Sequence, residues 1–231
     1  MARVIPSDRL SQLIAAAADV FIAQGYRRTQ IEDVAQALGV AKGTIYGSVQ
    51  SKEALFDAAL RYADGLEPLP DISALPLPTP EAGSTLAWLR SRITREAHDL
   101  ELTAALGRTR VRDARQELTA VLGDLYERME RNRHGIKLVD RCSLDQPELA
   151  AVWFGEGRWA QHAALAQYLQ RRIAKGHLRS VGDVAIAARL LLETVAFWAV
   201  HRHWDPSPQQ VAESDVQTNV IELLIRSLEK E

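Results

Sequence analysis

The chain has 231 residues, of which 47% are hydrophobic and 25% are charged, and its formal net charge is −2. These values exclude a disordered or fibrous chain and a general polyanion binder, and the length predicts a small domain followed by a larger one. A single cysteine, Cys142, excludes an intramolecular disulfide and the zinc sites that need several thiolates.

The first predicted element is an amphipathic helix over residues 7–24. Apolar residues recur there at helical spacing, and Gly25 ends the pattern. The apolar run 13–23 is too short to span a bilayer and contains Asp19. No other segment reaches the length of a membrane span, so we expect a cytoplasmic protein without a membrane partner.

Two short helices joined by a tight turn are predicted next. Thr29 and Glu32 have the spacing of a capping box, which predicts a helix start near Gln30. Gly39 stops this helix, because glycine adopts the positive φ that a tight turn requires. With a second helix over residues 42–49, the pair forms a helix-turn-helix. The donors on the second helix that can reach phosphate oxygens or base edges are Lys42, Thr44, Tyr46 and Ser48.

A fourth helix is predicted over residues 52–66, with Ser51 as its cap and Lys52 near its start, where free N–H groups favour a phosphate. The prolines between residues 68 and 80 then exclude a helix and predict an extended linker. Because the fourth helix joins the helix-turn-helix to this linker, it is expected to transmit changes between the domains. The predicted domains are residues 1–64, a linker at 65–83, and residues 84–231.

The rest of the chain is predicted to be helical, so the expected fold class is all-α. The pattern is amphipathic up to residue 131 and strongly apolar after residue 183. Residues 135–146 are expected to be irregular, and Pro147 is expected at the first position of a helix. The predicted helices are 84–105, 111–131, one beginning at 147, 159–175, 183–204 and 209–229.

Residues 8–62 contain a set of spaced residues that match the pattern of a known family. It comprises Phe21, Gly25, Tyr26, Thr29, the run GVAKGTIY from Gly39 to Tyr46, and the run SKEALF from Ser51 to Phe56. Together these residues resemble the DNA-binding domain of the TetR family of bacterial transcriptional regulators (TetR/AcrR-like). The resemblance implies a homodimeric repressor that a small-molecule effector releases from a double-stranded DNA operator. The residues expected to bind DNA are Thr29, Ala41, Lys42, Gly43, Thr44, Tyr46, Ser48 and Lys52.

Departures from the family pattern cluster around the second helix. Gln30 stands where a second threonine is common, Ala41 where a capping serine is usual, and Val49 where an aromatic residue usually packs. Gly47 and Ser48 replace residues that are more often large and polar or aromatic. Each change is small or apolar, so the fold is expected to persist. Ala41 nevertheless lacks a hydroxyl cap worth about 1 kcal/mol, which affects operator affinity.

Aromatic residues in the C-terminal domain fill a helical core or line an apolar cavity. The resemblance favours a cavity, because TetR-like regulators bind their effector in this domain. Residues 190–200 are apolar nearly all round, which indicates that a second surface covers them. The resemblance implies that the last two helices pair with those of a second copy. The residues expected to contact the effector are Trp88, Tyr126, Trp153, Trp159, His162 and Phe197.

No sequence pattern indicates catalysis. The histidines are scattered, and no nucleophile or carboxylate pair has the spacing of an active or metal site, so no enzyme, metal or cofactor is expected. Residues 1–64 carry seven basic and seven acidic side chains, so DNA binding requires a local basic face. A helical ligand-binding or scaffold protein with a vestigial helix-turn-helix is therefore the alternative. The candidates for the basic face are Arg27, Arg28, Lys42 and Lys52.

Overall fold

The computed structural model describes residues 7–207 and 210–230. Apart from one isolated β-bridge, the regular structure in these ranges is helical, which confirms the all-α prediction. The chain divides into two compact units. Unit 1 contains the described residues up to Leu89 together with His134–Trp153, and unit 2 contains Arg90–Arg133 and the described residues from Phe154 onward. The predicted functional domains, residues 1–64 and 84–231 with a linker at 65–83, remain predictions.

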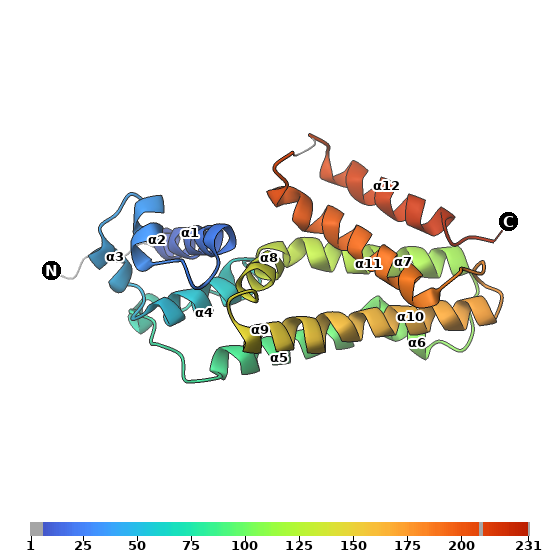
Figure 1. Ribbon diagram of the computed structural model, residues 1–231, viewed down its shortest axis with the longest axis horizontal. Helices are drawn as coiled ribbons and strands as arrows, with labels where there is room; N and C mark the ends of the chain where they lie inside the picture. The colour runs from blue at the N-terminus through green and yellow to red at the C-terminus, as the bar shows by residue number, and fades with distance from the viewer. Residues whose placement is uncertain (1–6, 208–209, 231) are drawn as a thin grey trace. The chain divides into compact units, whose positions relative to one another are not determined.

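Unit 1 is built around the packing of α1 on α4 and of α2 on both α1 and α3. The side chains of Phe21, Ile45 and Leu55 are at most 2% exposed and lie in its core. Burial of these apolar surfaces fixes α1, α3 and α4 against one another. The helices are α1 Ser7–Gln24, α2 Ile31–Ala37, α3 Lys42–Tyr46, α4 Lys52–Tyr62, α8 Arg133–Cys142 and α9 Pro147–Ala150, with the first part of α5 Ser84–His98 (Figure 1).

The helix ends follow the predicted glycine and serine signals in most places. Gly25 follows α1 with a φ of 85°, and the Ser51 side chain accepts a hydrogen bond from the Ala54 N–H at 3.1 Å. The fourth helix is shorter than predicted, because the chain turns at Gly65, whose φ is 66°. Pro147 is the first residue of α9, as predicted.

The predicted capping box of α2 is wrong. The cap is Gln30, whose backbone N–H donates to the Asp33 carboxylate at 2.7 Å. Thr29 lies one residue earlier, and its hydroxyl donates to the Gly25 carbonyl at 2.8 Å. The buried turn that precedes α2 takes up the Thr29 hydroxyl, so the neighbouring residue becomes the cap.

The proline-rich segment runs extended along the helix-turn-helix. Leu77 bridges to Val49, with the Leu77 N–H donating to Ser48 O at 2.8 Å and the Gln50 N–H donating to Leu77 O at 2.9 Å. Thr79 adds a hydroxyl bond to Ser51 at 2.8 Å. One 3₁₀ turn, Ile72–Ala74, interrupts the segment. These bonds attach the linker to the start of α4.

The prediction of irregular structure over residues 135–146 is wrong, because α8 occupies most of it. The Asp64 carboxylate accepts hydrogen bonds from the N–H groups of His134 and Gly135 at 2.9 and 3.0 Å and so caps this helix. A Cβ atom at Gly135 would lie 2.7 Å from Asp64 Oδ2. Glycine here admits a cap from a distant residue and does not break the helix.

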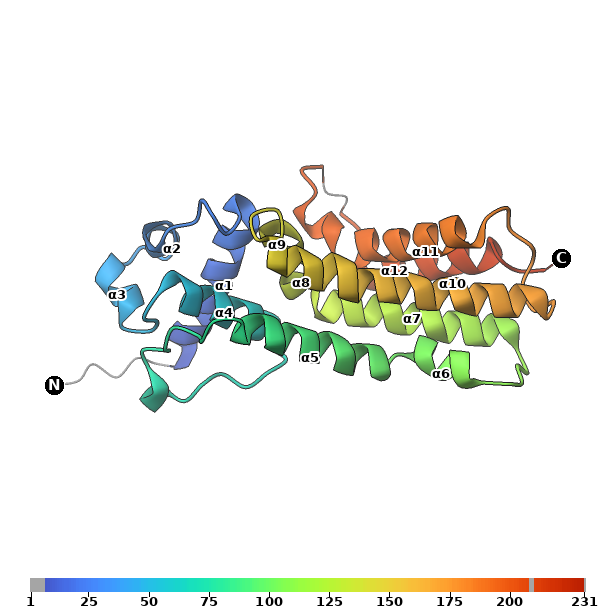
Figure 2. The same ribbon diagram turned by 60° about the horizontal axis from the view of Figure 1, so that its bottom comes forward.

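Unit 2 is a set of packed helices in which α7 contacts α11 and α12, and α10 contacts α6 and α11. The side chains of Asp113 and Asp183 cap α7 and α11, and Gly176 ends α10 with a φ of 72°. None of the described helices has the length and apolar run needed to cross a bilayer. The helices are α6 Glu101–Gly107, α7 Ala114–Arg131, α10 Trp159–Ala174, α11 Val184–Ala199 and α12 Glu213–Arg226, with the rest of α5 (Figure 2).

The two apolar helices near the C-terminus are shorter than predicted. The helix α11 ends at Ala199, and a 3₁₀ turn, His201–Trp204, follows it. Elsewhere in the chain, a π-helical segment, Ala151–Arg158, precedes α10. The last helix begins at Glu213, and the predicted start at residue 209 lies outside the described residues.

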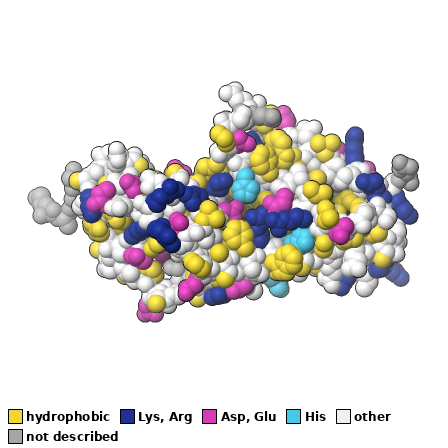
Figure 3. Space-filling model, viewed as in Figure 1, with side chains coloured by type: hydrophobic (Ala, Val, Ile, Leu, Met, Phe, Trp, Pro, Cys, Tyr) yellow, Lys and Arg dark blue, Asp and Glu magenta, His cyan; other side chains and the backbone are white. Residues whose placement is uncertain are grey.

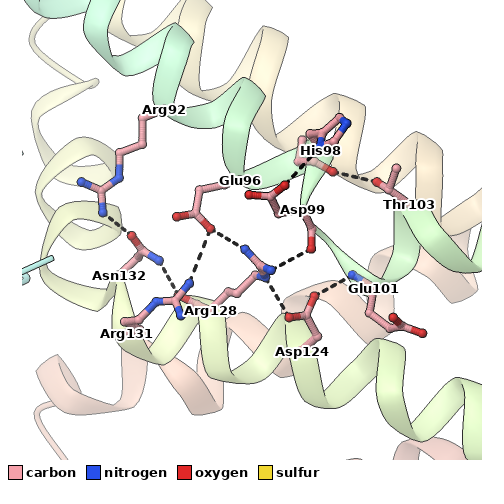
Figure 4. Close-up of polar contacts among 11 residues, drawn as sticks. Arg92, Glu96, His98, Asp99, Glu101, Thr103, Asp124, Arg128, Arg131 and Asn132 are labelled. Carbon is pink, nitrogen blue, oxygen red and sulfur yellow. Dashed lines mark hydrogen bonds and ion pairs between the residues drawn. The ribbon is translucent and has the colours of Figure 1, made fainter.

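The prediction of one helix over 84–105 is wrong, because α5 ends at His98 and α6 begins at Glu101. Leu100 between them is extended, with φ −65° and ψ 137°. The Asp124 carboxylate, from α7, accepts the Glu101 N–H at 2.8 Å and satisfies the start of α6 (Figure 4).

Arg128 on α7 stabilises this break from the other side. Its guanidinium donates to Asp124 Oδ1 at 2.8 Å, to Glu96 Oε2 at 2.9 Å and to the Asp99 carbonyl at 2.7 Å (Figure 4). The last of these bonds gives a partner to the Asp99 carbonyl, which lies just after α5 and has no helical partner because the helix is interrupted there. The periodicity of residues 84–105 carries no signal for partners that lie on another helix.

Candidate DNA-binding site

The turn between α2 and α3 has the geometry that a helix-turn-helix requires. Gly39 has a φ of 65°, and the Val40 N–H donates to the Ala35 carbonyl at 2.9 Å. Helix α3 then begins after Ala41, which supplies no side-chain cap. Ile45 is 2% exposed and anchors α3 to the core. A short helix held by one buried residue therefore presents the rest of its surface to solvent.

Most of the predicted DNA-binding residues lie on this surface. Tyr46 is 42% exposed, and the four residues 41–44 are exposed as well. Thr29 and Ser48 are 1% and 6% exposed, so their side chains are not presented to solvent. The structure thus brings five of the eight residues together on α3 and its cap. It places Thr29 and Ser48 in the supporting core, and Lys52, half-buried, at the start of α4.

Lys42 forms an exposed ion pair with Glu32 of α2 and lies 5.8 Å from the centroid of the Tyr46 ring. The hydrogen bond from Lys42 lowers the pKa of Glu32, and the same bond raises the pKa of Lys42. Exposed ion pairs contribute little to stability. A DNA phosphate can therefore replace Glu32 as the partner of Lys42 at small cost.

Lys52 lies next to the turn that precedes α2. Its Nζ donates to the Arg27 carbonyl at 3.3 Å and lies 4.5 Å from the centroid of the Tyr26 ring. Burial, followed by the nearby Glu53 carboxylate, raises the pKa of Tyr26 to about 12, and the Tyr26 hydroxyl donates to Glu53 at 3.3 Å. The Lys52 ammonium therefore lies against the backbone of Arg27, while Lys42 forms its ion pair with α2.

The residues predicted to contact an effector are divided between the two units. In unit 1, the Arg61 Cζ lies 4.8 Å from the centroid of the Trp88 ring, and the Trp153 Nε1 donates to Asp140 Oδ1 at 2.5 Å. The other four are in unit 2. The Tyr126 side chain is fully buried there and its hydroxyl donates to the Trp198 carbonyl at 3.4 Å.

His162 is also buried in unit 2, with its Nε2 2.9 Å from the Ala185 carbonyl. Trp159 stacks on His162 but is 62% exposed, and Phe197 is 40% exposed. Tyr126 and His162 therefore belong to the interior, whereas Trp159 and Phe197 face solvent in the single chain. Among the described residues, no three His, Cys, Asp or Glu side chains are grouped as a metal site would require.

Part of the last two helices presents exposed apolar side chains, in the region where the sequence analysis expected a second surface over residues 190–200, and Figure 3 shows hydrophobic side chains on the surface of the molecule. Ile186 and Leu190 on α11 are 62% and 63% exposed, and Leu223 on α12 is 68% exposed. Residues 186, 190 and 197 are spaced so that they lie on one face of a helix, and this spacing could have identified them from the sequence. We refer to Ile186, Leu190, Phe197 and Leu223 as the exposed apolar face.

A helix-turn-helix with an exposed α3, followed by a larger helical unit, is the architecture of one-component transcriptional regulators, which combine a DNA-binding domain and an effector-binding domain in one polypeptide. Residues 13–59 match the model of bacterial regulatory proteins of the tetR family, and residues 137–226 match the C-terminal domain of AefR-like transcriptional repressors. The chain belongs to the TetR family of transcriptional regulators. This family binds operator DNA, responds to effector ligands and is not enzymatic, as the sequence analysis expected.

Comparison with individual proteins agrees with this assignment. The chain is 27% identical over 202 residues to the HTH-type transcriptional repressor KstR2 of Rhodococcus jostii (strain RHA1), covering 87% of this chain and 81% of that protein. Its fold resembles the ketosteroid transcriptional regulator KstR2 of Mycobacterium tuberculosis, with a TM-score of 0.59, 18% identity, and coverage of 99% and 98% of the two chains. It also resembles the probable transcriptional regulatory protein RHA5900, with a TM-score of 0.61, 19% identity, and coverage of 96% and 100%.

Proposed function

We propose that this protein represses transcription in the cytoplasm as a homodimer bound to a two-fold operator, and that a small-molecule effector in its C-terminal domain releases it. The observation that carries the proposal is the exposed α3, which follows a glycine turn and presents donors within the family match at 13–59. Helices of this kind enter the major groove and read base edges.

The proposed DNA contacts follow from exposure. Lys42, Thr44 and Tyr46 offer donors to phosphates or bases. Ala41 has only a methyl side chain and Gly43 has none, which lets the α3 backbone approach the duplex. Half-buried Lys52 offers a positive charge to a phosphate near the start of α4. Thr29 and Ser48 are buried, so we assign them to positioning and not to contact.

The homodimer is proposed from the exposed apolar face. Large apolar side chains that stand more than 60% exposed on two neighbouring helices favour burial against another surface. A two-fold axis places the same face of a second copy opposite and buries both. The dimer then presents two α3 helices, which is the reason for expecting a two-fold operator.

The proposed effector contacts are Trp88, Tyr126, Trp153, Trp159, His162 and Phe197. Tyr126 and His162 have the strongest support, because they are buried polar side chains among the helices of unit 2. A bound effector that contacts them would replace their existing hydrogen bonds to the backbone carbonyls of Trp198 and Ala185. Steroid-like compounds are the first to screen, because the Mycobacterium tuberculosis regulator of similar fold is named for ketosteroids.

Selection of bound duplexes from random DNA tests this function, together with binding to the DNA upstream of the protein's own gene. We expect enrichment of a two-fold repeat. Failure to enrich any sequence would instead favour the helical ligand-binding or scaffold protein with a vestigial helix-turn-helix. Once a compound binds, calorimetric titration with and without the selected duplex should give affinities that differ by roughly 5- to 150-fold, because coupling between two sites is reciprocal.

A further inference from the structure

The turn between α1 and α2 is held from outside the helix-turn-helix by the end of α8. The Arg141 Nη2 donates to the Gln24 carbonyl at 2.9 Å, and the Arg27 backbone N–H donates to Asp145 Oδ2 at 3.0 Å. These partners are separated by 117 and 118 residues along the chain. Both ends of one four-residue turn are thus fixed by distant side chains, and we call this pair of contacts the α8 clamp.

Gly25, inside this turn, shows how closely the clamp approaches. A Cβ atom on Gly25 would lie 2.6 Å from Asp145 Oδ2 and 2.9 Å from Arg141 Nη1, and the φ is 85°. Gly39 also has a positive φ, at 65°, but nothing lies within 4 Å of its Cβ position. Gly39 therefore serves only the backbone turn, whereas Gly25 serves both its turn and the contact with α8.

The clamped turn determines where α2 starts. The Thr29 hydroxyl and backbone N–H both donate to the Gly25 carbonyl, at 2.8 and 3.3 Å, and Lys52 holds the Arg27 carbonyl at 3.3 Å. Because Thr29 immediately precedes the α2 cap, a displacement of the turn moves α2. Helix α2 packs on α3, so the same displacement moves the DNA-reading helix.

We propose that Arg141 and Asp145 are positioning residues for operator binding, through which the C-terminal module sets the orientation of the helix-turn-helix. The inference rests on the proposed function. Both residues lie within 137–226, which matches the C-terminal family model, whereas the clamped turn lies within 13–59. The clamp connects the two modules at a point far along the chain from α4, the helix that the sequence analysis expected to connect them.

Electrostatics alone predicts the opposite effect of removing Asp145. The loss of a negative charge from a DNA-binding protein reduces its repulsion from phosphates and raises its affinity for any duplex. The clamp predicts that Asp145→Ala lowers operator affinity, because the Arg27 N–H loses its acceptor and the turn is released. The sign of the change therefore separates the two accounts.

The test uses the full-length chain, the duplex that the unaltered protein selects from random DNA, and a scrambled duplex. Asp145→Ala should weaken binding to the selected duplex by about 10-fold, within the usual range of coupling between sites, and leave the scrambled duplex nearly unchanged. Asp145→Asn is the matched control, because its carboxamide oxygen can still accept the Arg27 N–H. It should stay within about threefold of the unaltered protein.

Amide hydrogen exchange measures, without DNA, how strongly the clamp stabilises the turn. The amides of residues 27–29 should exchange faster in Asp145→Ala than in Asp145→Asn, because local opening becomes easier when the turn loses its outside support. A second pair, Gly25→Ala and Gly39→Ala, imposes similar backbone strain at both sites but a clash with α8 only at the first. Gly25→Ala should therefore lose more operator affinity than Gly39→Ala.

Two outcomes distinguish failure of the clamp from failure of the function. If Asp145→Ala binds the selected duplex as tightly as the unaltered chain, or more tightly, and its amides exchange at the same rate, the clamp is overturned while the repressor function stands. If the unaltered protein selects no duplex, the proposed function fails, and the role of the clamp in operator binding fails with it.

Discussion

Tyr46 is the largest exposed side chain of α3, with Ile45 beside it in the core at 2% exposure. Tyr46→Ala should change the free energy of unfolding by less than about 0.5 kcal/mol, because the side chain packs little. It should lower operator affinity by about 1–3 kcal/mol if the ring or hydroxyl reads a base edge. Filter binding and urea denaturation measure the two quantities.

Ile45→Ala is the control for this prediction. Truncating a buried isoleucine costs about 2–5 kcal/mol of stability, so operator binding should fall together with folding. Unchanged affinity of the folded Tyr46→Ala variant would show that another part of α3 reads the operator.

Cys142 gives a pH dependence that can be measured directly. Burial, followed by the nearby Asp145 carboxylate, raises the pKa of the Cys142 thiol from 9.0 to about 12. Between these values the unfolded chain loses the proton and the folded chain keeps it, so the free energy of unfolding falls as the pH rises. From pH 8 to pH 10 this thiol should account for a loss of about 1.4 kcal/mol.

Cys142→Ala tests the assignment by difference. The variant should lose less stability between pH 8 and pH 10, by about the same 1.4 kcal/mol, although it starts lower because of the cavity. Burial also raises the pKa values of Tyr26 and Tyr126 to about 12, but both tyrosines are present in each variant. Their contributions cancel apart from the charge of Cys142 itself, which is the smallest of the causes that raise the pKa of Tyr26. Parallel stability curves for the two proteins would contradict the prediction.

At the scale of elements, the break between α5 and α6 depends on Arg128 (Figure 4). Arg128→Ala should lower the free energy of unfolding by about 2 kcal/mol, because it removes three charge-assisted bonds from a side chain that is 21% exposed. Urea denaturation measures the loss.

Arg131, one turn later on α7, is the matched control. Its guanidinium lies 3.7 Å from the same Glu96 carboxylate, but the side chain is 49% exposed. Arg131→Ala should therefore cost less than about 0.5 kcal/mol. Equal losses for Arg128→Ala and Arg131→Ala would mean that the break is stabilised by packing and not by the Arg128 bonds.

For the whole molecule, adjacent leucines on α11 separate dimerisation from folding. Leu190 belongs to the exposed apolar face, whereas Leu191 is 3% exposed. Leu190→Asp should leave the chain folded but monomeric, because a carboxylate without a partner cannot be buried between two copies. Leu191→Asp should unfold it. Sedimentation velocity at micromolar concentration, with circular dichroism, measures both states.

The unaltered chain should sediment as a dimer, and Leu190→Asp should bind a two-fold operator more weakly than the unaltered chain does. A monomeric unaltered chain would remove the dimer from the proposed mechanism. A dimeric Leu190→Asp variant would place the interface on another surface.

Several features of the fold depend on short-range rules and were therefore predictable from the sequence. The all-α class and the extended linker follow from helical periodicity and from the prolines, which restrict φ and remove backbone donors. The Ser51 cap and the ends of helices at Gly25 and Gly176 involve only residues within one turn of the chain. Within the candidate site, the exposure of residues 41–44 and Tyr46 follows from a helix that the Gly39 turn defines, whereas the burial of Thr29 and Ser48 had no signal in the sequence.

Other features depend on residues that meet only when the chain folds. Arg172, 1% exposed, donates to Glu117 Oε1 at 2.6 Å and joins α10 to α7, although residue 172 sits in an ordinary amphipathic pattern. Asp64 caps α8 across 70 residues, so a helix that begins at Arg133 continues through Gly135, where the local sequence predicts a loop. Periodicity records which side of a helix is apolar, but it does not record which distant side chain satisfies a buried N–H group or charge. That pairing was decided by the tertiary structure, because leaving such a group without a partner costs more than the local preference for a loop or a helix.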